Sequence, residues 1–354
     1  MSRTKILVVC CTCACMLLWQ GICEGSQYQI HVLDKPGGLY PAAATRIDDH
    51  GLIVGYSYVD ATKSLEMGAY YWDSAGAHYS GIALGSYVIA GVNNAGTIVG
   101  NQYVRSNDIL TTLPVLLPAF PYNGFRDIND AGVVVGSSCY DTGRHQRAAY
   151  WDSSGVHAIG TDVTSWANAI NSSGHIAGIR YTGPNIRTPF SWDNGLITDI
   201  GVLSGCISGD ANDVNDLGQV VGSCYGSDSF YQGPFRKAFL WQNGHTTDLL
   251  GWSDKATSAT GINNSGQVVG YSYTSAGQYS AFLWENGAIT QLEGLGGDTL
   301  ALGINSDGWI VGSSIGTDKG KYAVVWEPVP EPSSLLVLVS GIAGFGWARR
   351  RVIG

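Results

Sequence analysis

The chain has 354 residues, of which 49 are glycine and only 13% are charged, and its formal net charge at pH 7 is −9. A net acidic surface argues against a nucleic-acid partner, because a phosphate backbone needs a basic face. Aromatic residues make up 11% of the chain. Together with the glycine content they favour an all-β extracellular protein over a helical one.

The first 25 residues have the layout of a secretory signal peptide. Arg3 and Lys5 precede an apolar run over residues 6–19, and small residues follow at Gly21, Cys23 and Gly25. A basic start, a short apolar run and small residues near a cleavage point are the three parts of such a signal. The run is too short to span a bilayer comfortably, so we expect residues 1–25 to be removed on export.

Three cysteines lie outside this leader, and an exported protein is free to form disulfides. Cys206 and Cys224 flank one predicted hairpin and could pair, whereas Cys139 would then stay single. Closeness in the chain does not establish the geometry that a disulfide needs. Three small, partly buried thiols are the alternative.

A nine-residue pattern, Ile-Asn-x-x-Gly-x-Val-Val-Gly in its fullest form, recurs seven times. Its first glycine stands at Gly51, Gly96, Gly132, Gly174, Gly218, Gly266 and Gly308, with a mean spacing of about 43 residues. Repeats of this length are typical of propellers, in which each blade is built from four short strands. Within each repeat the Asn side chain can bond to the backbone and the Gly supplies a positive φ, so the pattern predicts a tight hairpin.

A second element follows each of these glycines except the second. It ends in tryptophan and reads Ala-Phe-Leu-Trp in its fullest form, at Trp72, Trp151, Trp192, Trp241, Trp284 and Trp326. A tryptophan at the same place in nearly every repeat predicts packing between blades. The second repeat is the shortest and offers Pro-Val-Leu-Leu near Leu117 instead, so we expect a degenerate blade with a trimmed outer strand.

The last repeat reaches Trp326 and then reads Glu-Pro-Val-Pro-Glu-Pro, which leaves no room for an outer strand. The segment Tyr28–Leu33, Tyr-Gln-Ile-His-Val-Leu, resembles the outer strands of the other repeats. We expect it to pair into the seventh blade, because this closes the ring and leaves no open sheet edge. The predicted fold is therefore an all-β, seven-bladed β-propeller over residues 26–328, closed by an N-terminal strand.

The two repeated elements together resemble the HAF-type extracellular repeat family, which is named for a His-Ala-Phe sequence ahead of Leu-Trp. Lys237 and Ser280 stand in place of that histidine in the two repeats that keep Ala-Phe-Leu-Trp. The resemblance covers nearly the whole mature chain. It implies an exported repeat protein and does not imply a particular activity.

The C-terminal segment, residues 329–354, looks like a PEP-CTERM sorting signal. It contains Pro330, Glu331 and Pro332, an apolar stretch over residues 335–347, and the basic cluster Arg349, Arg350 and Arg351. The resemblance implies a short transmembrane helix, recognition by an exosortase-type processing enzyme, and release to the cell surface or extracellular matrix. Arginines on the cytoplasmic side would fix the orientation of the helix. A plain C-terminal membrane anchor uses the same residues.

No convergent catalytic set, metal site or cofactor motif is predicted. Gly312–Gly316 matches the Gly-x-Ser-x-Gly pattern of hydrolases, but sister repeats continue a strand there and a nucleophile elbow needs a strand-to-helix turn. Asp127–Gly132 and Asp213–Gly218 superficially resemble calcium loops without the alternating ligands and distal Glu of an EF-hand. The seven histidines are scattered, without metal-binding spacing.

Three tryptophans lie off the repeated register and are candidates for a ligand surface: Trp166, Trp252 and Trp309. Trp166 and Trp252 are expected in loops after outer strands. With these residues the sequence favours a surface or matrix binding module, or a structural module, for an extracellular polysaccharide or a protein partner. The alternative is a carbohydrate hydrolase or lyase with carboxylates around the propeller channel, because a fold alone does not exclude catalysis.

Overall fold

The structure, a computed structural model, describes residues 27–34, 42–58, 67–85, 89–141, 145–160, 164–226, 236–249, 256–275 and 277–329. The chain divides into two compact units. One unit is Ile30–Glu327. The other combines Met1–Gln29 with Pro328–Gly354, and of it only residues 27–29 and 328–329 are described.

Several predictions from the sequence fall outside the described residues. They are the signal peptide, the sorting helix and the residues Pro330, Glu331, Pro332, Arg349, Arg350, Arg351 and Trp252. Within the described ranges every regular element is a strand. No described helix has the length and apolar character to cross a membrane.

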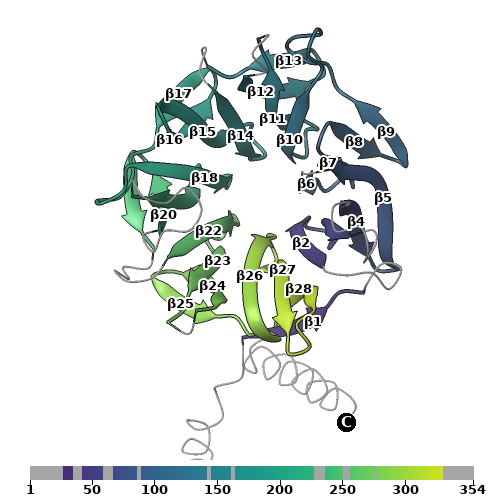
Figure 1. Ribbon diagram of the computed structural model, residues 1–354, viewed down its shortest axis with the longest axis vertical. Coiled ribbons are helices and arrows are strands. Elements are labelled where there is room, and N and C mark those ends of the chain that lie inside the picture. Colours follow the sequence, from purple (N-terminus) through teal and green to yellow (C-terminus); the bar gives the residue numbers. More distant parts are fainter. Residues whose placement is uncertain are drawn as a thin grey trace, which may run out of the picture. The chain divides into compact units, whose positions relative to one another are not determined.

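The described residues form seven four-stranded antiparallel sheets, arranged around a circle with the first strand of each repeat innermost (Figure 1). This confirms the predicted all-β, seven-bladed propeller. Blade 1 contains β2 (Ala42–Ile47), β3 (Ile53–Tyr58), β4 (Met67–Asp73) and β5 (Gly76–Gly85). Blade 2 contains β6 (Ile89–Val92), β7 (Ile98–Gly100), β8 (Tyr103–Ser106) and β9 (Ile109–Thr112). Blade 3 contains β10 (Asn123–Ile128), β11 (Val134–Cys139), β12 (Gln146–Asp152) and β13 (Gly155–Ala158).

The remaining blades repeat this plan. Blade 4 contains β14 (Ser165–Ile170), β15 (Ile176–Gly183), β16 (Ile186–Asp193) and β17 (Leu196–Asp199). Blade 5 contains β18 (Ser208–Val214), β19 (Val220–Tyr225), β20 (Arg236–Gln242) and β21 (His245–Asp248). Blade 6 contains β22 (Thr257–Ile262), β23 (Val268–Tyr273), β24 (Tyr279–Glu285) and β25 (Ala288–Gln291). Blade 7 contains β26 (Gly296–Ile304), β27 (Ile310–Gly316), β28 (Lys321–Pro328) and β1 (Tyr28–Val32).

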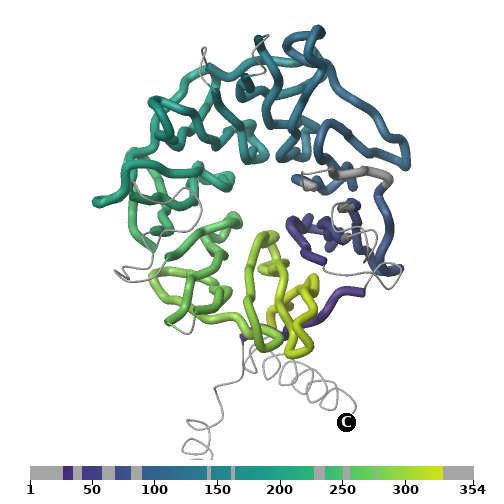
Figure 2. The backbone as a smooth tube through the Cα atoms, in the orientation of Figure 1, coloured from purple at the N-terminus to yellow at the C-terminus, as the bar shows by residue number. Residues whose placement is uncertain are grey.

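Blade 7 closes the ring with a strand from the other end of the chain. Its strand order is β1-β28-β27-β26, and the purple β1 lies beside the yellow β28 in Figure 2. The backbone N–H of Leu33 donates to the Ala323 carbonyl at 3.0 Å. The predicted closure is confirmed, and it gives the edge of β28 the partner that its own repeat lacks.

The glycine that ends the nine-residue pattern lets adjacent strands approach closely, as Gly222 and Gly270 show. A Cβ added at Gly222 would lie 2.0 Å from the Asp210 carbonyl oxygen, and one at Gly270 would lie 2.0 Å from the Ser258 oxygen. No side chain fits at such a distance, so the pattern keeps glycine here for space.

The recurring tryptophans pack between blades. Trp72, Trp151 and Trp326 are all at most 3% exposed. Each indole N–H donates to a main-chain carbonyl just after the outer strand of the preceding blade, at Asp34 (2.8 Å), Pro114 (2.7 Å) and Glu293 (2.8 Å) respectively. Burial together with a satisfied N–H explains a tryptophan at this place.

The expectation of a trimmed outer strand in blade 2 is wrong. Its sheet has all four strands, although β7, β8 and β9 contain only three or four residues each. The Pro-Val-Leu-Leu segment follows β9 and belongs to no strand. Leu116 packs against the apolar cluster that contains Phe125 and Trp151, so this segment covers the junction of blades 2 and 3 instead.

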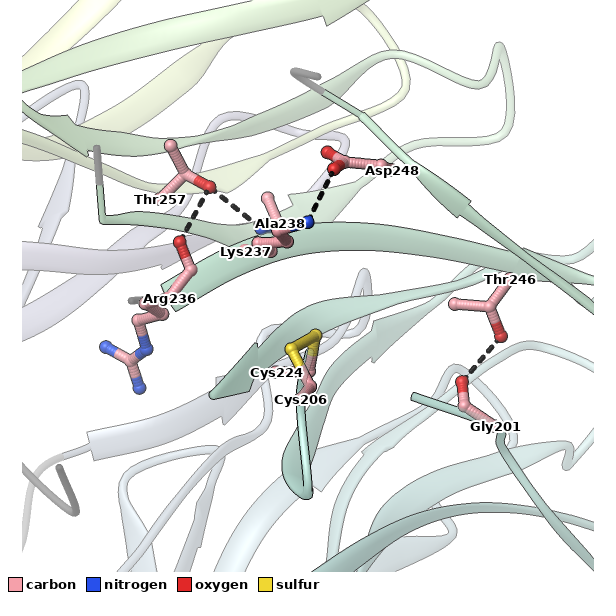
Figure 3. The surroundings of a disulfide bond; sticks show 9 residues. All are labelled: Gly201, Cys206, Cys224, Arg236, Lys237, Ala238, Thr246, Asp248 and Thr257. Carbon is pink, nitrogen blue, oxygen red and sulfur yellow. Dashed lines mark hydrogen bonds and ion pairs between the residues drawn. A yellow bond between two sulfur atoms is a disulfide. The ribbon is translucent and has the colours of Figure 1, made fainter. Parts of the chain in front are cut away.

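Two further motifs have local explanations. Gly312–Gly316 lies wholly within β27, which leaves no strand-to-helix turn for a nucleophile. Cys206 and Cys224 are joined by a disulfide with a Cα separation of 5.7 Å, shown in Figure 3. The bond fastens the loop before β18 to β19, and Cys139 is buried in β11.

Candidate functional site

The seven repeated hairpins meet at one end of the central channel and surround a cavity of about 200 Å³. We call this end the narrow mouth; its polar lining comes from Asp48, Asp49, Asn93, Asn94, Asn129, Asp130, Asn171, Ser172, Asn215, Asp216, Asn263, Asn264, Asn305 and Ser306. Every blade contributes the same two positions of its repeat. Its chemistry is therefore set by the repeat itself.

In the described part of the chain, the first of these positions forms a ring of hydrogen bonds that crosses every blade junction except one. The amide N–H of each asparagine donates to the main-chain oxygen of the equivalent residue in the next blade, at 2.9–3.1 Å. The side-chain oxygen accepts the N–H of the residue four positions on, which closes the hairpin. We call these residues the asparagine ring: Asn93, Asn129, Asn171, Asn215, Asn263 and Asn305.

Asp48 occupies the seventh place in this ring. Its carboxylate accepts the N–H of Leu52 at 2.7 Å and the N–H of His50 at 2.9 Å. The asparagines of the ring accept main-chain N–H groups of their own hairpins in the same way. An ionised carboxylate has no hydrogen to donate to the next blade. Burial raises the pKa of Asp48, and the hydrogen bonds from Leu52 and His50 oppose that rise.

The second position forms a more exposed ring of acceptors and donors. Ser306 donates to Asp49 at 2.7 Å, Asn94 bridges Asp49 and Asp130, and Ser172 donates to Asp216 at 2.7 Å. Burial acts to raise the pKa of Asp49, but the hydrogen bonds from Ser306 and Asn94 outweigh it and lower that pKa. Among the described residues, no group of three or more acidic, histidine or cysteine side chains is arranged to hold a metal ion. The rings stabilise the mouth through bonds between their own members.

A β-bulge in every inner strand turns one residue into the channel. The ladder of each inner strand skips a residue, and a bulge of this kind re-aims a side chain. The skipped residues all line a second cavity, which lies at the other end of the channel: Thr45, Ala90, Arg126, Asn168, Asn212, Thr260 and Leu302.

The residue that follows each bulge stands in the sequence between a residue that lines one cavity and a residue that lines the other, and we call this set the neck: Arg46, Gly91, Asp127, Ala169, Asp213, Gly261 and Gly303. Most are small because the blades crowd together here; a Cβ at Gly91 would lie 2.8 Å from the Asp127 Cα. Asp127 accepts the Ile170 N–H of the next blade at 3.0 Å, and Asp213 accepts the Ile262 N–H at 2.8 Å.

The two neck carboxylates have shifted titrations. Burial raises the pKa of Asp127 to about 7, opposed by the positive charge of Arg46 and reinforced by the charge of Asp213. Burial also raises the pKa of Asp213, again opposed by Arg46. These are the first residues of the two segments that resemble calcium loops, and each side chain reaches across a blade junction.

The other end of the channel, where the inner strands begin, opens into a cavity of about 950 Å³ that we call the wide mouth. Its lining includes the rings of Tyr122, Phe125, Trp166, Tyr181 and Tyr271. It also includes the amide side chains of Asn101, Gln146, Asn168 and Asn212, and the charged side chains Arg46, Arg126, Arg187, Asp210 and Arg236.

Trp166 lines the wide mouth, but its predicted place in a loop is wrong, because it stands on the inner strand β14. Its indole N–H donates to the Gln146 oxygen at 2.6 Å. The ring meets Tyr181 edge-on, with centroids 5.8 Å apart. These contacts hold the indole at the blade 3 to blade 4 junction.

The structure places Trp309 elsewhere. Its side chain packs against the apolar cluster between blades 7 and 1. Its main-chain N–H closes a hairpin by donating to the side-chain oxygen of Asn305 at 2.9 Å. Trp166 and Trp309 are thus not brought together.

The charged group on the wall of the wide mouth was missed in the sequence. Arg187 contacts Asp210 at 3.1 Å and Arg236 contacts the same carboxylate at 3.9 Å. A positional signal exists: Gln146, Arg187 and Arg236 each stand five residues before the recurring tryptophan of their blade. The chemistry changes there while the tryptophan stays, which marks a position that the fold leaves unconstrained.

A family model of the PEP-CTERM protein-sorting motif matches residues 328–351. The motif implies an exported protein that an exosortase recognises and that is directed to the cell surface. The resemblance to HAF-type repeats stays a prediction. A comparison with curated proteins found no match.

Several solved structures share the propeller fold. The β-propeller domain of the Trilobed protease from Pyrococcus furiosus superposes with a TM-score of 0.55 at 11% identity, covering 83% of this chain and 95% of that one. YCF48 bound to D1 peptide gives a TM-score of 0.52 at 12% identity, covering 87% and 98%. A puromycin-hydrolysing peptidase from Mycobacterium tuberculosis gives 0.52 at 10% identity, covering 84% and 56%. At these identities the likeness concerns the fold alone.

Proposed function

We propose that the protein is an exported binding module that holds a polysaccharide in the wide mouth of its propeller channel. The lining of that cavity carries the proposal, because it combines aromatic rings with amide and guanidinium side chains. A sugar ring presents C–H faces that pack on aromatic rings and hydroxyl groups that bind planar donors and acceptors. The sorting motif, which directs the chain to the cell surface, supports an extracellular ligand.

The shape of the wide mouth favours a saccharide over a protein partner. Arginine and aromatic residues are enriched at protein interfaces as well, so the residue types of the lining do not separate the two kinds of ligand. A cavity of about 950 Å³ has the size of a small-ligand site, in which a few sugar units fit. The narrow mouth suits a ligand less well, because its asparagine ring donates and accepts within itself.

Binding of soluble neutral and acidic oligosaccharides to the full-length chain in mild detergent, measured by titration calorimetry, tests this function. Trp166→Ala should weaken binding by roughly tenfold, since it removes a stacking surface. Tyr79→Ala is the matched control, because Tyr79 is 52% exposed and lies outside the cavity lining. If none of the saccharides binds, or if both variants behave alike, the proposal fails.

A carbohydrate-active enzyme is the second candidate, and the neck favours it. A carboxyl group whose pKa lies near 7 is suited to general acid or base chemistry, and Asp127 meets that condition beside a second carboxylate, Asp213. The test is to incubate the full-length chain with the same oligosaccharides, and shortening of an oligosaccharide that Asp213→Asn abolishes would establish catalysis. Intact oligosaccharide after prolonged incubation would reject the enzyme and leave binding as the function of the module.

A further inference from the structure

The two arginines on the wall of the wide mouth do not share Asp210 equally. Arg187 holds it at 3.1 Å, and both side chains are largely buried, with 17% and 14% exposed. Arg187 also donates through Nε to the Tyr181 hydroxyl at 3.3 Å. The negative charge of Asp210 is therefore matched mainly by Arg187.

Arg236 is left with weak contacts. Its guanidinium lies 3.9 Å from Asp210 and donates to the Tyr271 hydroxyl at 3.5 Å, the upper limit for a hydrogen bond. The guanidinium carbon (Cζ) of Arg236 lies 5.9 Å from the centre of the Tyr225 ring. A guanidinium carries five N–H donors, so these contacts leave most of its capacity unused.

The unused donors of Arg236 face the cavity. The side chain is 34% exposed and belongs to the lining of the wide mouth. In Figure 3 its guanidinium points away from Thr257 and Lys237, which lie on the far side of the strand. A ligand in the cavity can therefore reach it without displacing a protein partner.

The charge of the wide mouth contrasts with that of the whole protein. The chain has a formal net charge of −9, whereas the cavity lining holds four arginines and one aspartate. Arg46 is opposed by the neck carboxylates Asp127 and Asp213. The arginines of the wall still exceed Asp210, so the cavity attracts a negative group on an otherwise acidic molecule.

We infer that the polysaccharide is acidic, and that one of its carboxylates binds Arg236 while neighbouring sugar rings pack on the aromatic side chains of the cavity. A guanidinium matches a carboxylate through two parallel N–H···O bonds. The adjacent Tyr271 hydroxyl offers a further contact to the same sugar. This inference rests on the proposed function and adds the charge class of its ligand.

The test compares an oligogalacturonate with its methyl ester, which keeps the sugar backbone and removes the charge. We expect the full-length chain to bind the free acid about 10- to 100-fold more tightly. Arg236→Gln should remove that preference, and added salt should weaken binding of the acid because the site is partly exposed. Arg236→Lys should restore part of the preference, since it keeps the charge without the planar pair of donors.

Arg180→Gln is the matched control. Arg180 forms a two-bond ion pair with Asp199 at 2.8 and 2.6 Å on the surface, outside the cavity lining. This variant should keep the full preference for the acid. Equal binding of acid and ester, or a preference that survives Arg236→Gln, would overturn the inference. If the ester binds equally well and Trp166→Ala weakens it, the proposed function stands while the acidic ligand is rejected; no binding of either rejects both.

Discussion

The two mouths of the channel are built from the same seven repeats and have opposite chemistry. At the narrow mouth six of the seven blades offer an asparagine at the same position, and each of these asparagines donates to the next blade around the ring. At the wide mouth the equivalent positions differ from blade to blade, for example Gln146, Arg187 and Arg236. Where the residue repeats, equivalent residues of neighbouring blades satisfy one another's hydrogen bonds. Where the residue varies, hydrogen-bond donors stay available for a ligand.

The difference teaches how a repeat protein separates stability from binding. A buried polar group costs free energy unless it is bonded. A residue that every blade repeats can always find the same partner next door. A residue that varies has no such repeated partner, and at the wide mouth its donors face a cavity that water or a ligand can reach.

Breaking the asparagine ring should give the largest effect on stability. Asn171→Ala removes the acceptor of the Ser173 and His175 N–H groups and the donor to the Asn215 carbonyl. Each of the three lost hydrogen bonds contributes about 0.5–1.5 kcal/mol, so we expect a loss of about 3 kcal/mol in the free energy of unfolding. Guanidinium denaturation of the full-length chain measures it.

The control for that variant is Leu217→Ala on a sister hairpin. Leu217 is 62% exposed, and its replacement should change stability by no more than about 0.5 kcal/mol. Saccharide binding by folded Asn171→Ala should be unchanged. A stability loss as small as that of the control would mean that the ring is not a structural device.

The neck carboxylate Asp127 tests how a buried charge that most blades lack affects the stability of the propeller. Because the pKa of Asp127 is raised to about 7 in the folded protein, the folded state binds its proton more tightly than the unfolded state does. Its contribution to stability is therefore present below the unfolded pKa, near 4, and is lost as the pH rises towards 7, by at most about 1.4 kcal/mol per pH unit.

Asp127→Asn should remove this dependence while keeping an acceptor for the Ile170 N–H. We expect the difference between variant and parent in free energy of unfolding to grow from pH 4 to pH 7 in favour of the variant. Measurements at both pH values check this. A difference that stays constant with pH would show that Asp127 titrates normally.

Completing the ring should give the smallest effect, and a stabilising one. Asp48→Asn supplies the N–H that the seventh position lacks and keeps the acceptor of the Leu52 N–H. We expect a gain of about 0.5–1.5 kcal/mol at neutral pH.

The gain from Asp48→Asn should shrink in acid. The pKa of Asp48 is raised in the folded protein, so protonation restores its contribution as the pH falls through the folded pKa. Asn305→Asp is the reciprocal control and should destabilise, because it removes an existing link to blade 1. Thermal unfolding that ranks Asp48→Asn below the parent protein would contradict the ring as described.

The sequence by itself determined the number of blades, the hairpins, the packing tryptophans and the closing strand. Each depends on local geometry repeated at a fixed spacing: an Asn and a Gly that form a turn, an indole with a carbonyl in reach, and a blade that lacks its outer strand. The complete outer strand of blade 2 is not evident from the sequence, because the short strands of this blade carry no tryptophan. The loop that contains Leu116 packs against the apolar cluster around Trp151 instead.

Only the tertiary structure decided which variable side chains face the channel. Side chains alternate along a strand, but a bulge in every inner strand shifts that alternation, so a period of two no longer tells the inside from the outside. Trp166 lines the wide mouth from the regular part of a strand, and Trp309 packs between blades from a hairpin. Asp210, Arg187 and Arg236 come from three strands and meet through folding alone.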